Sequence, residues 1–158
     1  MKLIKAVILC VAALAATPTF AQDPSADSNM QILLNKVKAD KKMVIAANME
    51  LSETEGKAFW PIYEAYQKDL QGINDRLGRA ILVYADAYNK KELTNDRAKK
   101  LIDEALAIDQ DELTLRRTYV ARLNHFLATK KVARYLQIEN KIRAALRYEL
   151  AAVIPLVQ

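Results

Sequence analysis

The sequence contains very little cysteine, histidine or glycine, and each shortage excludes a class of chemistry. One of its 158 residues is a cysteine, Cys10, one is a histidine, His125, and three are isolated glycines. This set cannot build a zinc site, a thiol-based active site or a covalent haem attachment. The glycines form no phosphate-binding loop, and none of the three serines has a candidate base beside it in the sequence. We therefore expect no catalytic residue, no metal site and no cofactor, and interpret the chain as a non-enzyme.

The N-terminus has the layout of a secretory signal peptide. A short basic start precedes an almost uninterrupted apolar run over residues 6–16, and small residues then precede a predicted cut before Gln22. The apolar run is shorter than the roughly 20 residues that a membrane-spanning helix needs. We expect a periplasmic protein with no stable membrane span after cleavage, organised as a cleaved signal peptide (1–21), a flexible tether (22–28) and a single domain (29–158).

The rest of the chain favours helix and shows no strand signal. Alanine, leucine, lysine, glutamate and arginine dominate, and these residues have high intrinsic helix propensity. Ser52 followed by Glu55 has the pattern of a capping box, and Thr94 is a second candidate N-cap. The sequence predicts an all-α domain of about four helices, two of them long, over approximately 29–49, 52–90, 94–128 and 130–152.

The apolar spacing predicts how these helices pack. Residues spaced by three and four form a clear seam on the second helix: Phe59, Tyr63, Tyr66, Leu70, Ile73, Leu77, Ala80 and Tyr84. We also expect Val44, Ile102, Leu106 and Leu146 to face inward on the other helices. At 1.5 Å per residue each long helix would span roughly 50 Å. An extended antiparallel hairpin is the favoured arrangement, and a compact four-helix bundle is the alternative.

Charge is distributed unevenly along the chain. Residues 22–115 carry 13 basic and 17 acidic side chains, whereas residues 116–158 carry nine basic and two acidic ones. In the periplasm, acidic segments of unfolded proteins, a sensor domain or an anionic membrane surface fit this charge better than nucleic acid does. A solvated face that keeps the protein soluble is the alternative. The candidate partner-binding residues are Trp60, Ile62, Arg116, Arg117, Arg122, Lys130, Lys131, Arg134, Arg143 and Arg147.

Two other features suggest weaker alternatives. Met30 and His125 could be the axial ligands of a haem-binding bundle, although His125 alone is expected at the surface. Carboxylates in the third helix could bind a cation, but they are spread around the helix, so ion pairs across its surface are favoured. These carboxylates are Asp103, Glu104, Asp109, Asp111 and Glu112.

Several short segments together resemble the Spy/CpxP-like periplasmic family. They are Leu51-Ser52-Glu53-Thr54-Glu55, Phe59-Trp60-Pro61-Ile62-Tyr63, Leu93-Thr94 and Ala133-Arg134-Tyr135-Leu136-Gln137-Ile138-Glu139. The resemblance covers most of the mature chain, but Glu55 and Arg97 stand where the family's Leu-Thr-x-x-Gln repeat has glutamine. It implies a long helical hairpin that pairs into a curved homodimer. It also implies ATP-independent protection of unfolded proteins, or restraint of an envelope-stress sensor. A small structural or regulatory module that binds one dedicated envelope partner is the alternative, and a haem- or metal-binding bundle is a third.

Overall fold

The computed structural model describes residues 40–157, and the described residues from Lys42 onward form one compact unit. Within the described residues all regular structure is helical, which confirms the predicted all-α class. The predicted signal peptide, tether and Met30 lie outside the described residues. Residues 40–49 are helical, and they are followed by α2 (Glu53–Asn89), α3 (Asn95–Asn124) and α4 (Thr129–Val153).

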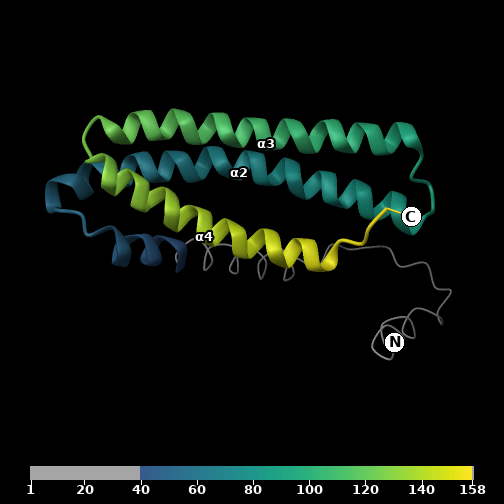
Figure 1. Ribbon diagram of the computed structural model, residues 1–158, viewed down its shortest axis with the longest axis horizontal. Helices are drawn as coiled ribbons and strands as arrows, with labels where there is room; N and C mark the ends of the chain where they lie inside the picture. The colour runs from purple at the N-terminus through teal and green to yellow at the C-terminus, as the bar shows by residue number, and fades with distance from the viewer. Residues whose placement is uncertain (1–39, 158) are drawn as a thin grey trace, which may run out of the picture. The chain divides into compact units, whose positions relative to one another are not determined.

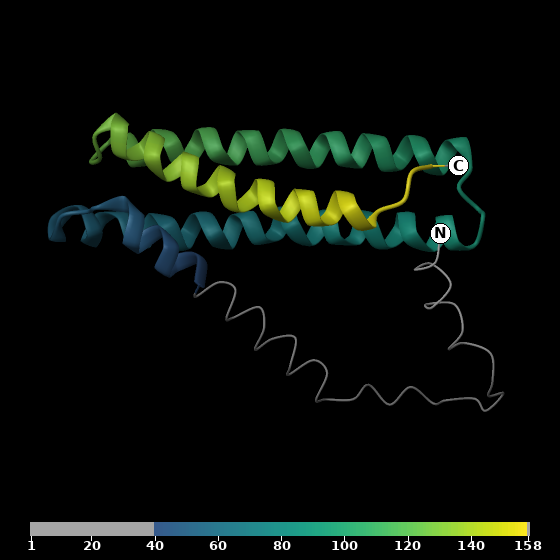
Figure 2. The same ribbon diagram turned by 60° about the horizontal axis from the view of Figure 1, so that its bottom comes forward.

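The two long helices form the predicted antiparallel hairpin, and α4 folds back onto it. In Figure 1, α2 and α3 lie side by side over their whole length. Figure 2 shows that α4 begins next to the end of α3 and then diverges from α3 toward the C-terminal part of α2. The hydroxyl of Tyr84 on α2 donates a hydrogen bond to the carbonyl oxygen of Pro155 (2.8 Å), which ties the segment after α4 to α2.

Both predicted N-caps are confirmed. The Ser52 hydroxyl accepts a hydrogen bond from the backbone N–H of Glu55 (3.2 Å), while the Glu55 carboxylate accepts one from the backbone N–H of Ser52 (2.8 Å). Thr94 accepts a hydrogen bond from the backbone N–H of Arg97 at the start of α3 (3.3 Å). These bonds satisfy N–H groups that have no acceptor inside the helix, so local sequence determines where α2 and α3 begin.

The end of α3 differs from the prediction. The helix ends at Asn124, four residues before the expected break near 128, and its last backbone bonds tighten to a three-residue spacing. Leu127 follows directly and is buried in the core. Burial of Leu127 therefore coincides with the chain leaving the helix, and a long-range contact of this kind is not visible in local sequence.

The hydrophobic core is concentrated at the end of the hairpin where α3 connects to α4, which we call the proximal half. Residues 42–49, the start of α2, the end of α3 and the start of α4 all contribute to it. The cluster comprises Ile45, Met49, Phe59, Tyr63, Tyr66, Leu70, Tyr119, Leu123, Leu127, Val132 and Tyr135. Outside the cluster, the only buried apolar residues in the described part of the chain are Ala87 and Ile108. We call the opposite end, around the connection between α2 and α3, the distal half.

Four side chains that were expected to face inward are exposed. Ile45 and Met49 occupy the core instead of Val44, because the buried face is shifted by one residue from the predicted line. Ile102, Leu106 and Leu146 are 59%, 63% and 58% exposed. Ile102 and Leu106 belong to the first half of α3, and Figure 2 shows that α4 has diverged from α3 at this end of the hairpin, which accounts for their exposure.

Candidate partner-binding surface

An open groove of about 470 Å³ lies between α3 and α4. Leu113 and Val120 of α3 and Leu136 of α4 supply its apolar lining, and Arg116 and Arg117 are among its polar residues. Figure 2 shows that α4 leaves α3 at an angle, and the groove between the two helices is open to solvent. The result is an accessible apolar surface with arginine at its edge.

The apolar lining continues along α3 beyond the groove. Ile102, Leu106, Leu113 and Val120 are spaced by four, seven and seven residues, which places them on one helix face. We call these four residues the α3 stripe. From residue 102 to residue 120 it extends about 27 Å at 1.5 Å per residue. Ile102 and Leu106 are exposed, whereas Leu113 and Val120 are partly buried and the exposed Asp109 lies between the two pairs. Apolar surface that stays accessible on a folded helix is typical of a site that binds another molecule.

Of the predicted basic residues, Arg117 is the best placed to attract a partner to the α3 stripe. It lines the groove, is exposed, and forms no ion pair with any residue in the described part of the chain. Lys130, near the α3–α4 connection, is likewise exposed and without an ion pair to described residues. The positive charge of both side chains is therefore available to attract a negatively charged partner.

Three other predicted arginines are directed toward a buried carboxylate. Glu112 of α3 is 6% exposed and contacts Arg143 directly, with Arg147 at 3.2 Å and Arg116 at 3.9 Å. Arg147 also pairs with Asp109 (2.8 Å). The contacts of Arg143 and Arg147 join α3 to α4, and together with that of Arg116 they offset much of the positive charge that the sequence assigned to a partner-binding face.

Two more of the basic candidates connect the start of α4 to Glu50 and to the start of α2. Lys131 pairs with Glu55 and donates to the backbone oxygen of Glu50 (3.1 Å), and Arg134 pairs with Glu50 (2.9 Å). The hydrogen bond from Lys131, followed by that from the Ser52 backbone N–H, lowers the pKa of Glu55. These contacts stabilise a residue with a left-handed backbone, since Glu50 has a φ of 48°.

Arg122 lies over a tyrosine ring rather than beside a carboxylate. Its guanidinium carbon is 4.7 Å from the ring centre of Tyr119, within the range of a cation–π interaction. The Tyr119 hydroxyl in turn donates a hydrogen bond to Asp69 of α2 (2.6 Å). Arg122 thus covers the edge of the contact between α2 and α3.

Trp60 and Ile62 belong to the edge of the core. The Trp60 ring lies edge-on to Phe59 and Tyr63, with ring centres 5.1 and 5.4 Å apart, and Lys42 lies 5.2 Å above it. Part of Trp60 lines a groove of about 420 Å³ that shares no residue with the α3–α4 groove. Ile62 packs against the core. The structure therefore does not bring Trp60 together with the α3 stripe.

Sequence reasoning missed the buried polar groups that accompany the tyrosines. Glu139 of α4 is 2% exposed and accepts a hydrogen bond from Gln67 of α2 (3.0 Å). Burial, and then the negative charge of Glu139, raises the pKa of Tyr135. The available signal was spacing, because Glu139 follows Val132 and Tyr135 by seven and four residues and so shares their buried face.

The acidic cluster of α3 forms ion pairs, but mostly between helices. Arg76 of α2 holds Glu104 through two hydrogen bonds (3.0 and 3.2 Å) and also contacts Asp111. Only Asp103 and Glu112 have partners on α3 itself, Lys99 and Arg116. In residues 40–157 no group of three or more histidine, cysteine, aspartate or glutamate side chains is arranged to hold a metal ion.

Comparisons with family models, with curated proteins and with solved structures found no match to this chain. No helix in the described range combines the length and apolarity required to cross a membrane.

Proposed function

We propose that this protein is a periplasmic, ATP-independent chaperone that holds apolar, negatively charged segments of unfolded envelope proteins along the α3 stripe. The observation that carries the proposal is a row of four accessible apolar side chains on one face of α3, of which Ile102 and Leu106 are exposed and the other two are partly buried, with the unpaired charge of Arg117 at its edge. The resemblance to the Spy/CpxP-like family supports the same class of activity. The predicted signal peptide supports the location.

We expect the charged side chains to act first, by attracting the client, and the apolar side chains to act second, by holding it. Arg117 and Lys130 attract an acidic segment over several ångströms, and the attraction weakens as salt screens it. Contact with the stripe then removes apolar surface of the client from water, which opposes its aggregation. A stripe of about 27 Å matches an extended segment of about eight residues at 3.3 Å per residue.

A dedicated envelope partner, such as a sensor domain or a second copy of this chain, is the second candidate. The end of α4 and the segment after it expose several large apolar side chains that lie away from the α3 stripe in sequence. These are Leu146, Tyr148, Val153, Leu156 and Val157. A partner that covers this region would be recognised as a single tight complex rather than as weak binding to many clients.

The test is light scattering of a denatured client to which the processed protein is added without ATP. We expect near-stoichiometric protein to suppress aggregation, and added salt to weaken the effect. Leu106→Ser should raise the amount required about tenfold, which corresponds to loss of one buried apolar side chain. Met43→Ser removes an equally exposed apolar side chain outside the stripe and should change nothing. Unchanged aggregation of several clients at several-fold excess of protein would exclude general chaperone activity and favour one dedicated partner.

A further inference from the structure

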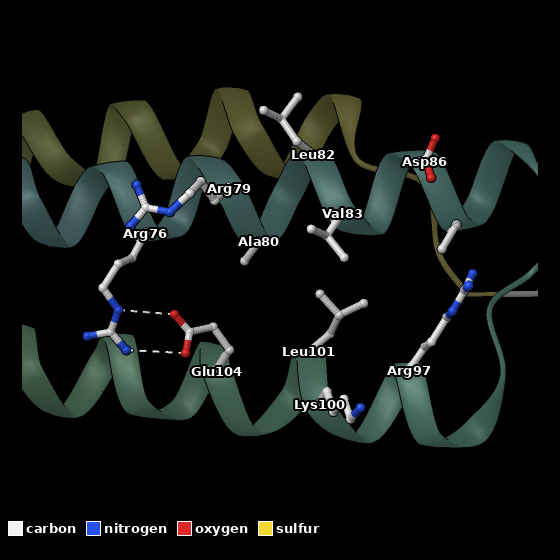
Figure 3. Close-up of a pocket in the computed structure, with 11 residues that line it drawn as sticks. Arg76, Arg79, Ala80, Leu82, Val83, Asp86, Arg97, Lys100, Leu101 and Glu104 are labelled. Carbon is white, nitrogen blue, oxygen red and sulfur yellow. Dashed lines mark hydrogen bonds and ion pairs between the residues drawn. The ribbon is translucent and has the colours of Figure 1, made fainter.

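A second and larger groove, of about 720 Å³, lies between α2 and α3 in the distal half. It opens on the face of the hairpin that α4 does not cover (Figure 3). Ala80 and Val83 of α2 and Leu101 of α3 point toward one another across it and form an apolar floor. The small side chain of Ala80 leaves space that a larger residue would fill.

Charged side chains surround this floor, and positive charge is in excess. The lining includes four cations, Arg76, Arg79, Arg97 and Lys100, and two carboxylates. Both carboxylates are already engaged, because Glu104 holds Arg76 and Asp86 pairs with Lys90. Arg97 pairs with Glu92 (2.9 Å).

Two cations remain without a partner. Arg79 on α2 and Lys100 on α3 form no ion pair with any residue among 40–157. They stand on opposite walls of the groove, and Figure 3 shows Arg79 directed along α2 toward Arg76 and Lys100 on the side of α3, with the apolar floor between them. An apolar floor flanked by two such cations is complementary to a molecule with one apolar chain and one negative group.

We propose that the α2–α3 groove binds a fatty-acid anion. Its single acyl chain lies over Ala80, Val83 and Leu101, and its carboxylate contacts one of the two unpaired cations, Arg79 or Lys100, at the edge of this floor. The lining residues on α2 run from 76 to 87, which corresponds to a groove about 16 Å long at 1.5 Å per residue. Its volume lies within the roughly 300–1,000 Å³ typical of small-ligand sites.

An acyl chain suits the groove because its apolar part can cover the floor formed by Ala80, Val83 and Leu101 while its only polar end meets a cation at the edge.

The site is independent of the proposed chaperone surface. It uses α2 and the α2-facing side of α3, whereas the α3 stripe begins at Ile102 on another side of that helix. Failure of one proposal therefore leaves the other intact, and variants on the two surfaces distinguish them.

The experiment is isothermal titration calorimetry of the processed protein with decanoate, dodecanoate and tetradecanoate, each below its micelle concentration. We expect one saturable site and an affinity that rises by up to about fourfold per added methylene, the equivalent of 0.8 kcal/mol. Dodecanol, which lacks the charge, should bind at least tenfold more weakly than dodecanoate.

Variants locate the site. Arg79→Gln with Lys100→Gln should weaken dodecanoate binding at least tenfold, and Val83→Asp should abolish it. Leu101→Gln on the opposite wall repeats the test if Val83→Asp does not fold, as judged by circular dichroism. Arg117→Gln with Lys130→Gln is the matched control and should bind normally. No saturable binding, or binding that survives the groove variants, would overturn the proposal. So would binding that is lost instead in Leu106→Ser, because the fatty acid would then occupy the α3 stripe.

Discussion

The proximal and distal halves of the hairpin use the same apolar seam on α2 but bury it to different extents. In the proximal half, Phe59, Tyr63 and Tyr66 are buried, and the rings of Tyr66 and Tyr119 meet at 5.2 Å. In the distal half, the seam continues with the same spacing, but its residues are only partly buried: Ile73, Leu77, Ala80 and Tyr84.

The number of helices that meet at each end explains the contrast. In the proximal half, residues 42–49, α2, α3 and α4 enclose the seam, whereas in the distal half α4 has moved away from α3. Regular apolar spacing therefore predicts which face of a helix is directed inward, but not how completely that face is covered. The uncovered surfaces of this protein are also its candidate binding sites.

The largest difference between the halves should appear when one side chain is removed from each. Phe59→Ala creates a cavity in the closed core and should lower the free energy of unfolding by about 4 kcal/mol. Leu82→Ala, at an exposed distal position, should change it by less than about 0.5 kcal/mol. Urea denaturation followed by circular dichroism measures both. Similar losses for the two variants would contradict the contrast between the halves.

Breaking an ion pair should also destabilise the protein more in the proximal half than in the distal half, but by less than removal of a core side chain. Glu112→Gln leaves Arg143 partly buried without its carboxylate and should cost about 3 kcal/mol. Arg76→Met breaks a more exposed set of ion pairs in the distal half and should cost less than about 1 kcal/mol. In a double-mutant cycle, the variant that combines Glu112→Gln with Arg143→Met should be less destabilised than Glu112→Gln alone, because the partly buried cation is removed as well. An Arg76 variant as destabilised as the Glu112 variant would show that the distal ion pairs matter equally.

Removal of either N-cap should lower the free energy of unfolding by a similar amount. The two variants should differ in which half of the hairpin is loosened. Ser52→Ala and Thr94→Ala each remove one capping bond and should each cost about 1 kcal/mol. Hydrogen exchange should show faster exchange at the start of α2 for the first variant and at the start of α3 for the second. Faster exchange throughout the unit in Thr94→Ala would show that the distal half does not open separately.

The smallest effect should be the pH dependence of the Glu55 contacts. The pKa of Glu55 is lowered in the folded protein, so its contribution to stability is present above its usual pKa of about 4.3 and is lost as pH falls through the lowered value. The stability difference between wild type and Glu55→Gln should be constant above pH 5 and shrink below about pH 4. Glu53→Gln, which removes a charge from the same turn without affecting Lys131, is the control. A difference that does not change with pH would show that the ion pair with Lys131 does not contribute.

Local features of the fold could be predicted from the sequence because local chemistry determines them. Ser52, Glu55 and Thr94 satisfy the first N–H groups of their helices whatever the rest of the chain does, and both caps were predicted correctly. The seam that contains Phe59 and Tyr66 was also predicted correctly, since its spacing repeats over many turns.

The binding surfaces could be predicted only in part. Arg117 was selected for its charge, but Ile102 and Leu106 were assigned to the core, because their spacing is the same whether or not a helix covers them. Arg143 was assigned to the surface, and only long-range packing shows that it faces Glu112. The course of α4 decides all of these outcomes, and no local pattern specifies it.

The most direct test of the proposed function is site-specific photocrosslinking to an unfolded client. A photoreactive phenylalanine analogue is placed at Leu106 on the α3 stripe or at Met43, which is similarly exposed outside it. We predict crosslinks to the client from position 106 that disappear at high salt and in the Arg117→Glu background, with few from position 43. Equal crosslinking from both positions, or crosslinking from position 43 alone, would contradict the assignment of the α3 stripe as the binding surface.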